Sequence, residues 1–193
     1  MTKILVVDDN EQNLYLLEVL LKGHGYQVLQ AANGAEALEL ARNAPPGLII
    51  ADILMPVMDG FALCREWKSD QQLRVIPFVF YTATYTSPED EEFALSLGAE
   101  RFIIKPQEPN VFIAYIEEVL ASHETGKLIA KRQPEQAEEI FYKEYNQTLV
   151  RKLEDKMLAL EVARDNLSRA NAHLLTLHQI DEAILNGQPL ETI

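Results

Sequence analysis

The segment KILVVDD, residues 3–9, opens the chain with a run of branched apolar residues that stops at two aspartates. Such a run is typical of a strand that is buried on both faces, as in a parallel sheet. Leucines at positions 14, 17, 20 and 21 then follow at helical spacing. The opening therefore predicts a strand followed by a helix, with carboxylates at the end of the strand.

The same alternation continues to residue 122. Strand patterns occupy residues 3–7, 26–30, 48–53, 76–81 and 102–104, and helical patterns occupy the region of 14–21 and residues 35–41, 61–67, 89–97 and 111–120. Glycine and proline turn signals at 23–25, 45–47 and 98 separate several of these segments. Strict strand–helix alternation predicts an α/β domain over residues 1–122, with a doubly wound five-stranded parallel sheet and helices on both faces.

Composition and charge narrow the class of protein. The 193 residues are 48% hydrophobic and 24% charged, which is ordinary for a globular chain. No apolar run approaches the roughly 20 residues that a membrane span needs. The single cysteine, Cys64, cannot form an internal disulfide, and the N-terminus enters a strand pattern at once. We therefore expect a cytoplasmic protein without a membrane partner.

The charge is −13 and is spread over both parts of the chain. Residues 1–122 carry 8 Lys or Arg against 18 Asp or Glu, and residues 123–193 carry 9 against 12. Neither part has the basic surface that binding to a phosphate backbone requires. We therefore expect no nucleic-acid partner.

Beyond residue 122 the pattern changes twice. Residues 123–137, which contain Gly126, Pro134 and mixed charge, predict a linker. Residues 138–186 predict one long helix with a seven-residue repeat of leucines at 153, 160, 167 and 174. The companion seam positions are Tyr142, Leu149, Lys156, Ala163, Ala170 and Leu177. A seam of about five heptads predicts a homodimeric coiled coil, in which the polar residues Asn146 and Lys156 lower stability but can fix the register.

Reactive side chains follow four of the predicted strands. Asp8 and Asp9 end the first strand, Asp52 ends the third, Thr82 the fourth and Lys105 the fifth. Ligands of open parallel sheets bind at the carboxyl ends of the strands. Three carboxylates repel one another unless a hard cation joins them, and Mg²⁺ prefers oxygen ligands. A hydroxyl and an ammonium group can contact phosphate oxygens. The pattern therefore predicts a site that takes a phosphoryl group with the help of Mg²⁺.

Pro106 is expected to shape the backbone, with a cis bond, so that Lys105 points inward.

Four motifs carry a resemblance to a known family. They are ILVVDDN (4–10), LIIADILMPVMDGF (48–61), VFYTAT (79–84) and FIIKP (102–106). Through them, residues 1–122 resemble a response regulator receiver domain, which is CheY-like and has a flavodoxin-like fold. The last 20 residues weakly resemble the entry helix of a GAF sensory domain, so residues 187–193 are read as a tail or as the start of a truncated downstream domain.

The receiver resemblance implies a role for each strand-end residue. Asp52 is the phosphoacceptor, and Asp8, Asp9, Asp52 and the backbone carbonyl of Leu54 are ligands of Mg²⁺. Thr82 and Lys105 contact the phosphoryl oxygens, and Thr82 and Phe102 form the conformational switch. The phosphoryl group comes from a sensor histidine kinase or a phosphotransfer protein. The chain is then no enzyme beyond self-phosphotransfer and self-dephosphorylation, which we expect to be slow because Leu54 offers no group to orient water.

Each of these sequence features also has a simpler structural explanation. An acidic pair at a strand end is usually a solvated loop, Lys-Pro is a common dipeptide, and an aromatic residue such as Phe102 near a sheet edge usually serves packing. The chain could thus be a dimerisation scaffold that is never phosphorylated. It could also be the receiver part of a hybrid kinase or a cyclase. We expect the phosphoacceptor reading, with the coiled coil relaying the phosphorylation state to an output domain that this chain lacks.

Overall fold

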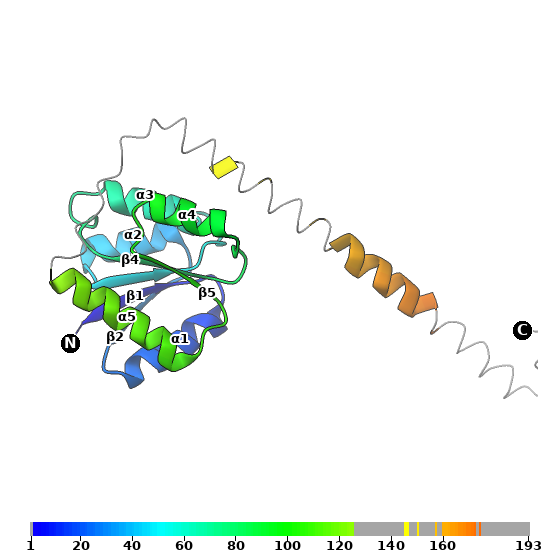
Figure 1. Ribbon diagram of the computed structural model, residues 1–193, viewed down its shortest axis with the longest axis horizontal. Helices are drawn as coiled ribbons and strands as arrows, with labels where there is room; N and C mark the ends of the chain where they lie inside the picture. The colour runs from blue at the N-terminus through cyan, green and yellow to red at the C-terminus, as the bar shows by residue number, and fades with distance from the viewer. Residues whose placement is uncertain are drawn as a thin grey trace, which may run out of the picture. The chain divides into compact units, whose positions relative to one another are not determined.

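The computed structural model describes residues 2–125, 145–146, 150, 157, 160–172 and 174. The chain divides into two units, residues 1–136 and 137–193. Strands and helices alternate in the first unit (Figure 1). They are β1 (Lys3–Val7), α1 (Glu11–Gly23), β2 (Gln27–Ala31), α2 (Gly34–Asn43), β3 (Leu48–Ala51), α3 (Gly60–Ser69), β4 (Phe78–Thr82), α4 (Pro88–Ser96), β5 (Arg101–Ile104) and α5 (Pro109–Glu124).

The five strands form one parallel sheet in the order β2-β1-β3-β4-β5. Helices α1 and α5 cover one face of the sheet, and α2, α3 and α4 cover the other (Figure 1). The predicted doubly wound α/β fold is therefore confirmed. In this order β3 is the central strand and β1 is its direct neighbour, so the residues that follow these two strands are brought side by side.

Each face of the sheet has its own apolar packing. On the α1/α5 side, leucines of α1 and aromatic and branched residues of α5 pack on alternate residues of the strands. On the other side the packing is aromatic. The ring of Phe61 lies 5.5 Å from that of Phe80, 5.2 Å from that of Tyr85 and 4.9 Å from that of Phe93, measured between centroids in edge-on geometry. Edge-to-face pairs at such distances are favourable, so α3 and α4 are held firmly against β4.

Side chains that cap helices explain why three helices begin directly after the loops that leave the sheet. Asn10 accepts hydrogen bonds from the backbone N–H groups of residues 12 and 13 and caps α1. Asn33 caps α2, and Asp59 caps α3 through the N–H of Ala62. Asn and Asp satisfy backbone donors that the first helical turn leaves free. Helix α1 therefore starts within two residues of the Asp8-Asp9 pair.

The structure corrects several predicted boundaries. The third strand ends at Ala51 rather than at residue 53, so Asp52 and Ile53 lie in the loop that follows. The last helix begins at Pro109 and ends at Glu124, instead of spanning 111–120. Residues 123 and 124, which the sequence assigned to the linker, therefore belong to α5. His123, in its last turn, interacts with the carbonyl of Val75, a contact that sequence periodicity does not reveal.

In the second unit, the described residues are helical over 160–172 and at positions 145–146, 150, 157 and 174. Three leucines of the predicted seam, Leu160, Leu167 and Leu174, are exposed by 69%, 63% and 62%. The rest of the predicted helix 138–186, most of the linker 123–137 and the tail 187–193 lie outside the described residues. The coiled coil therefore stays a prediction. Within the described part of the chain, no helix is both long and apolar enough to cross a membrane.

Candidate phosphoacceptor site

Parallel pairing brings the five predicted residues to one edge of the sheet. Asp8 and Asp9 follow β1, and Asp52 follows its neighbour β3. Thr82 is the last residue of β4, and Lys105 follows β5. Carboxylate oxygens of the three aspartates lie within 4.8 Å of one another. The acidic cluster that the sequence predicted is therefore formed by the fold.

Asp52 lies in the middle of this cluster with little contact to solvent. Its Oδ1 accepts a hydrogen bond of 2.8 Å from the backbone N–H of Ile53, and its Oδ2 lies 3.5 Å from Nζ of Lys105. Burial raises the pKa of Asp52, an effect that the Lys105 charge opposes and the Asp8 charge reinforces. The Asp52 side chain is nevertheless 14% exposed, so its carboxylate is accessible to a cation from solvent.

Asp8 is the most enclosed of the three aspartates, with a side chain that is 2% exposed. Its Oδ1 accepts hydrogen bonds from the backbone N–H of Asn10, at 2.9 Å, and from Nδ2 of Asn13, at 3.0 Å. Its Oδ2 lies 3.1 Å from the same Asn13 nitrogen and 2.6 Å from Nζ of Lys105. The shortest ion pair of Lys105 is therefore with Asp8 and not with Asp52. Asp9, in contrast, is exposed.

The loop between β3 and α3 is held close to Asp52 by Gly60. A Cβ atom at this position would lie 2.2 Å from the backbone oxygen of Asp52 and 2.8 Å from Cα of Ile53. The N–H of Gly60 donates to the carbonyl of Ile53 at 2.8 Å. Leu54, in this loop, has a side chain that is 39% exposed, and Val57 adopts a φ of 67°. Only glycine allows α3 to start this close to the backbone of Asp52 and Ile53.

Thr82 and Lys105 complete the site from the β4–β5 side. Thr82 is fully buried, its hydroxyl interacts with Asp52, and its Oγ1 accepts the N–H of Thr84 at 3.3 Å. The peptide bond between Lys105 and Pro106 is cis, as expected from the sequence. Nζ of Lys105 also lies 5.2 Å from the ring centroid of Tyr81, within the range of a cation–π interaction.

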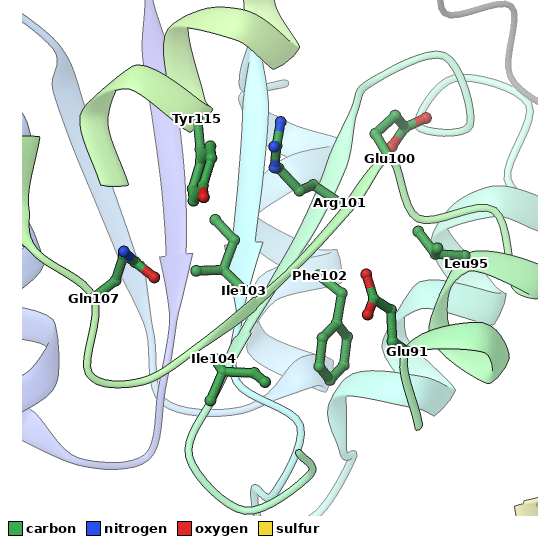
Figure 2. A pocket seen from close by; sticks show the side chains of 9 residues that line it. All are labelled: Glu91, Leu95, Glu100, Arg101, Phe102, Ile103, Ile104, Gln107 and Tyr115. Atoms are coloured by element: carbon green, nitrogen blue, oxygen red, sulfur yellow. The ribbon is translucent and has the colours of Figure 1, made fainter. Parts of the chain in front are cut away.

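Phe102 lies away from the acidic cluster and lines a hollow of about 440 Å³ among α4, β5 and α5. Figure 2 shows its ring beside Glu91 in this hollow, with Leu95 and Ile104 nearby. The ring is only partly buried, and its centroid lies 6.2 Å from that of Phe80. Across the hollow, the Arg101 guanidinium stacks on Tyr115 at 4.0 Å and pairs with Glu118. Phe102, the predicted switch residue, thus lies at the protein surface beside α4, β5 and α5.

Sequence reasoning missed three residues of this site. They are Asn13, which contacts Asp8, Tyr81, which lies near Lys105, and Gly60, which approaches Asp52. An available signal was the place of Asn13 in the first turn of the helix that follows the acidic pair, where a side chain can reach back to the strand end. Cys64 is fully buried, and burial raises the pKa of its thiol.

The donor set fits a magnesium ion. All candidate ligands are oxygen atoms, three carboxylates stand close together, and the Lys105 ammonium group lies beside two of them. Mg²⁺ is usually bound by one or two carboxylates together with water and phosphate oxygens. The exposure of Asp9 leaves room for such waters.

The comparisons agree with this geometry. Residues 4–117 match the family described as response regulator receiver domain. Protein PilH of Pseudomonas aeruginosa is 35% identical over 121 residues, which are 63% of this chain and 99% of PilH. PhoP of Bacillus subtilis, an alkaline phosphatase synthesis transcriptional regulatory protein, is 37% identical over 126 residues, which are 63% of this chain and 50% of PhoP.

Solved structures of receiver domains have a similar fold. The signal receiver domain of a signal transduction histidine kinase from Syntrophus aciditrophicus superposes with a TM-score of 0.59 and 36% sequence identity. That alignment covers 63% of this chain and 92% of the solved domain. The similarity to these proteins therefore concerns the receiver part of the chain.

Proposed function

The chain belongs to the response regulator receiver domain family, and on this premise we propose that Asp52 accepts a phosphoryl group from a sensor histidine kinase or a phosphotransfer protein. The observation that carries the proposal is the meeting of Asp8, Asp9 and Asp52 within 4.8 Å, with Lys105 beside Asp8 and Asp52. Two of these carboxylates lie beside the ammonium group and the third is exposed, which suits a site for a metal ion and a phosphoryl group.

In this proposal each residue has one task. An oxygen of Asp52 attacks phosphorus of the donor phosphohistidine, the P–N bond breaks, and the imidazole leaves with a proton from solvent. Lys105 moves from Asp8 toward the new phosphoryl oxygens, and the Thr82 hydroxyl donates to another of them. Both groups already contact or approach Asp52, so the movement required is small.

Asp8, Asp9, Asp52 and the Leu54 carbonyl would hold Mg²⁺ at this site. When bound, the ion supplies positive charge that offsets the charge of the transferring phosphoryl group and of the carboxylates. The exposed Asp9 is the carboxylate most open to a hydrated cation, and the enclosed Asp8 is already held by hydrogen bonds from the protein.

A mass measurement tests the acceptor directly. Incubation of the full chain with acetyl phosphate and MgCl₂ should add about 80 daltons, the mass of one phosphoryl group. Asp52→Ala should abolish the gain, whereas Asp59→Ala, which removes an aspartate that caps α3, should leave it in place if the chain stays folded. A gain that persists in Asp52→Ala would refute the assignment. No gain in the wild-type chain would favour the alternative of a scaffold that is never phosphorylated.

We further propose that phosphorylation is relayed by Thr82 and Phe102. When Thr82 moves toward the phosphoryl group, space opens next to β5, and the partly buried ring of Phe102 can turn inward from the hollow in Figure 2. The chain would then change its surface at α4, β5 and α5. It would act as a regulator that slowly dephosphorylates itself, and not as an enzyme on other substrates. The protein would be located in the cytoplasm.

The long C-terminal helix would dimerise the chain and carry the change at the α4, β5 and α5 surface to an output domain. The full protein would then be a response regulator, a hybrid kinase or a cyclase. Leu160 and Leu167 are exposed on a described helical segment at heptad spacing, which is the observation that supports this part. Sedimentation equilibrium provides the test. Leu167→Lys on the seam should convert a dimer into a monomer, whereas Val162→Lys, off the seam and also exposed, should not. Equal masses for both variants and the wild type would refute the coil.

A further inference from the structure

Asn13 makes contacts that helix formation does not require. It lies in the first turn of α1, where the side chain of Asn10 already caps the helix through the N–H groups of Gln12 and Asn13. Asn is also a poor helix former compared with Ala or Leu. Its amide nevertheless points at Asp8, with Nδ2 3.0 Å from Oδ1 and 3.1 Å from Oδ2. The side chain therefore serves the carboxylate and not the helix.

The contact with both oxygens has a geometric consequence. One donor that bridges the two oxygens resists rotation of the carboxylate about its own axis, and the N–H of Asn10 fixes Oδ1 from a second direction. The third donor is Lys105, at 2.6 Å from Oδ2. Because the Asp8 side chain is 2% exposed, water cannot easily replace a donor that is lost.

Of these donors, Lys105 is the one that the phosphoryl group would draw away. Asp8 would then lose its closest partner at the moment when a cation depends on its orientation. The Asn13 amide is neutral, so it neither repels a cation nor follows the phosphoryl group. A carboxylate has about four lone-pair sites, and the three donors make four contacts with Asp8. Departure of Lys105 would therefore free a site on Oδ2 for a cation or its bound water.

We propose that Asn13 is a positioning residue for the magnesium site, holding the Asp8 carboxylate in the orientation that the cation needs. The inference rests on the proposed function and extends it to a residue outside the acidic cluster. Hydrogen-bond partners of metal-binding side chains typically account for about 10- to 100-fold in metal affinity. The lower end applies here, because Asn10 and Lys105 also hold Asp8.

The test is calorimetric titration of the full chain with MgCl₂. Asn13→Ala and Asn13→Leu should raise the Kd for Mg²⁺ by about 10-fold. The leucine variant has nearly the shape of asparagine and favours a helix, so it guards against an effect of lost packing. Gln12→Ala is the matched control, because it shortens a neighbouring exposed amide side chain, and among the described residues the donors to Asp8 are Asn10, Asn13 and Lys105. Circular dichroism at each temperature used should show that all variants are folded.

A kinetic readout separates positioning of the cation from a general structural effect. The initial rate of phosphorylation by acetyl phosphate should need about 10-fold more Mg²⁺ for half-saturation in both Asn13 variants, with a plateau equal to that of the wild type. A fall in the plateau at an unchanged half-saturating concentration would overturn the proposal, as would an unchanged or smaller Kd. If the wild-type chain neither binds Mg²⁺ nor gains a phosphoryl group, the proposed function itself fails. If it does both and the Asn13 variants match it, only the present inference fails.

Discussion

The receiver domain contains two enclosed lysine–carboxylate pairs, one at each end of its strands. At the carboxyl ends, Lys105 pairs with Asp8 at 2.6 Å, and the side chains are 13% and 2% exposed. At the amino ends, Lys68 of α3 pairs with Glu100, just before β5, at 2.8 Å, and the exposures are 5% and 8%. The two pairs have the same chemistry and similar burial, but their surroundings differ.

The pair at the amino ends is balanced. Both oxygens of Glu100 accept from Nζ of Lys68, at 2.8 and 3.0 Å, and one of them also accepts the N–H of Phe78 at 2.5 Å. Lys68 donates in addition to the carbonyl of Ile76, which Trp67 also contacts. One positive charge meets one negative charge, and the pair joins α3 to the starts of β4 and β5. This arrangement is suited to stability.

The pair at the carboxyl ends is unbalanced. Lys105 pairs with Asp8 and lies near Asp52, and the carboxylate of Asp9 stands beside these two, so negative charges outnumber the positive one. The excess negative charge is unfavourable in the absence of a cation. The difference teaches that one kind of ion pair can serve stability where charges match, and ligand binding where they do not. Stability given up at a binding site is a common cost of function.

The largest expected effect tests the balanced pair. Lys68→Met removes the ammonium group but keeps the aliphatic bulk, and it leaves Glu100 charged and enclosed. Loss of one partner of a buried pair costs about 3–5 kcal/mol, so urea unfolding should show a loss of that size. Arg42→Met breaks the more exposed pair with Asp70 and should cost less than about 1 kcal/mol. Similar losses for the two variants would contradict a special role for Lys68.

A second variant tests how closely α3 packs against the loop that contains Asp52. Gly60→Ala places a methyl group against the backbone of Asp52 and Ile53. Overpacking typically costs about 1–3 kcal/mol, and a clash with main chain should reach the upper part of that range. Gly23→Ala, in α1, meets no atom within 4 Å and should be neutral or stabilising. Thermal unfolding of both variants checks the prediction, and an unchanged Tm for Gly60→Ala would refute it.

A third variant removes part of the excess charge. Because burial raises the pKa of Asp52, the folded state binds its proton more tightly than the unfolded state does. This contribution to stability is present below the unfolded pKa and is lost as the pH rises through the folded pKa. At neutral pH the ionised carboxylate is therefore unfavourable, and Asp52→Asn should stabilise the chain by about 1 kcal/mol.

The pH dependence is the decisive part of that prediction. In buffer with a chelator, the advantage of Asp52→Asn in urea unfolding should shrink as the pH falls through the window between the two pKa values, because Asp52 then becomes neutral in both states. Added MgCl₂ should also reduce the advantage by stabilising the wild type. An advantage that does not change with pH would show that its origin is not the charge.

The smallest expected effect concerns Tyr81, whose ring centroid lies 5.2 Å from Nζ of Lys105. A cation–π contact is worth about 0.5–1 kcal/mol at a partly exposed site. Tyr81→Leu should therefore weaken the binding of beryllofluoride, a phosphoryl analogue, by about 2- to 5-fold. Tyr81→Phe keeps the ring and should bind like the wild type. Equal affinities for the leucine and phenylalanine variants would remove Tyr81 from the site.

The sequence predicted more of the site than of its supports. Asp8, Asp52, Thr82 and Lys105 were found because each follows a buried strand, and carboxyl ends of parallel strands meet at one edge. The contact between Asn13 and Asp8 was not found, because it depends on the rotation of α1 against β1 and on a side-chain rotamer. The length of α5 was underestimated, since residues 121–124 carry little apolar periodicity.

What the sequence by itself determined is the α/β fold and the acidic edge, because strand and helix periodicities and the polar residues after each strand are local features. What only the tertiary structure decided is how the charges are shared. Lys105 lies closer to Asp8 than to Asp52, and Lys68 meets Glu100, 32 residues away. Such pairings depend on distances between separate elements, and those distances are set by the packing of helices on the sheet.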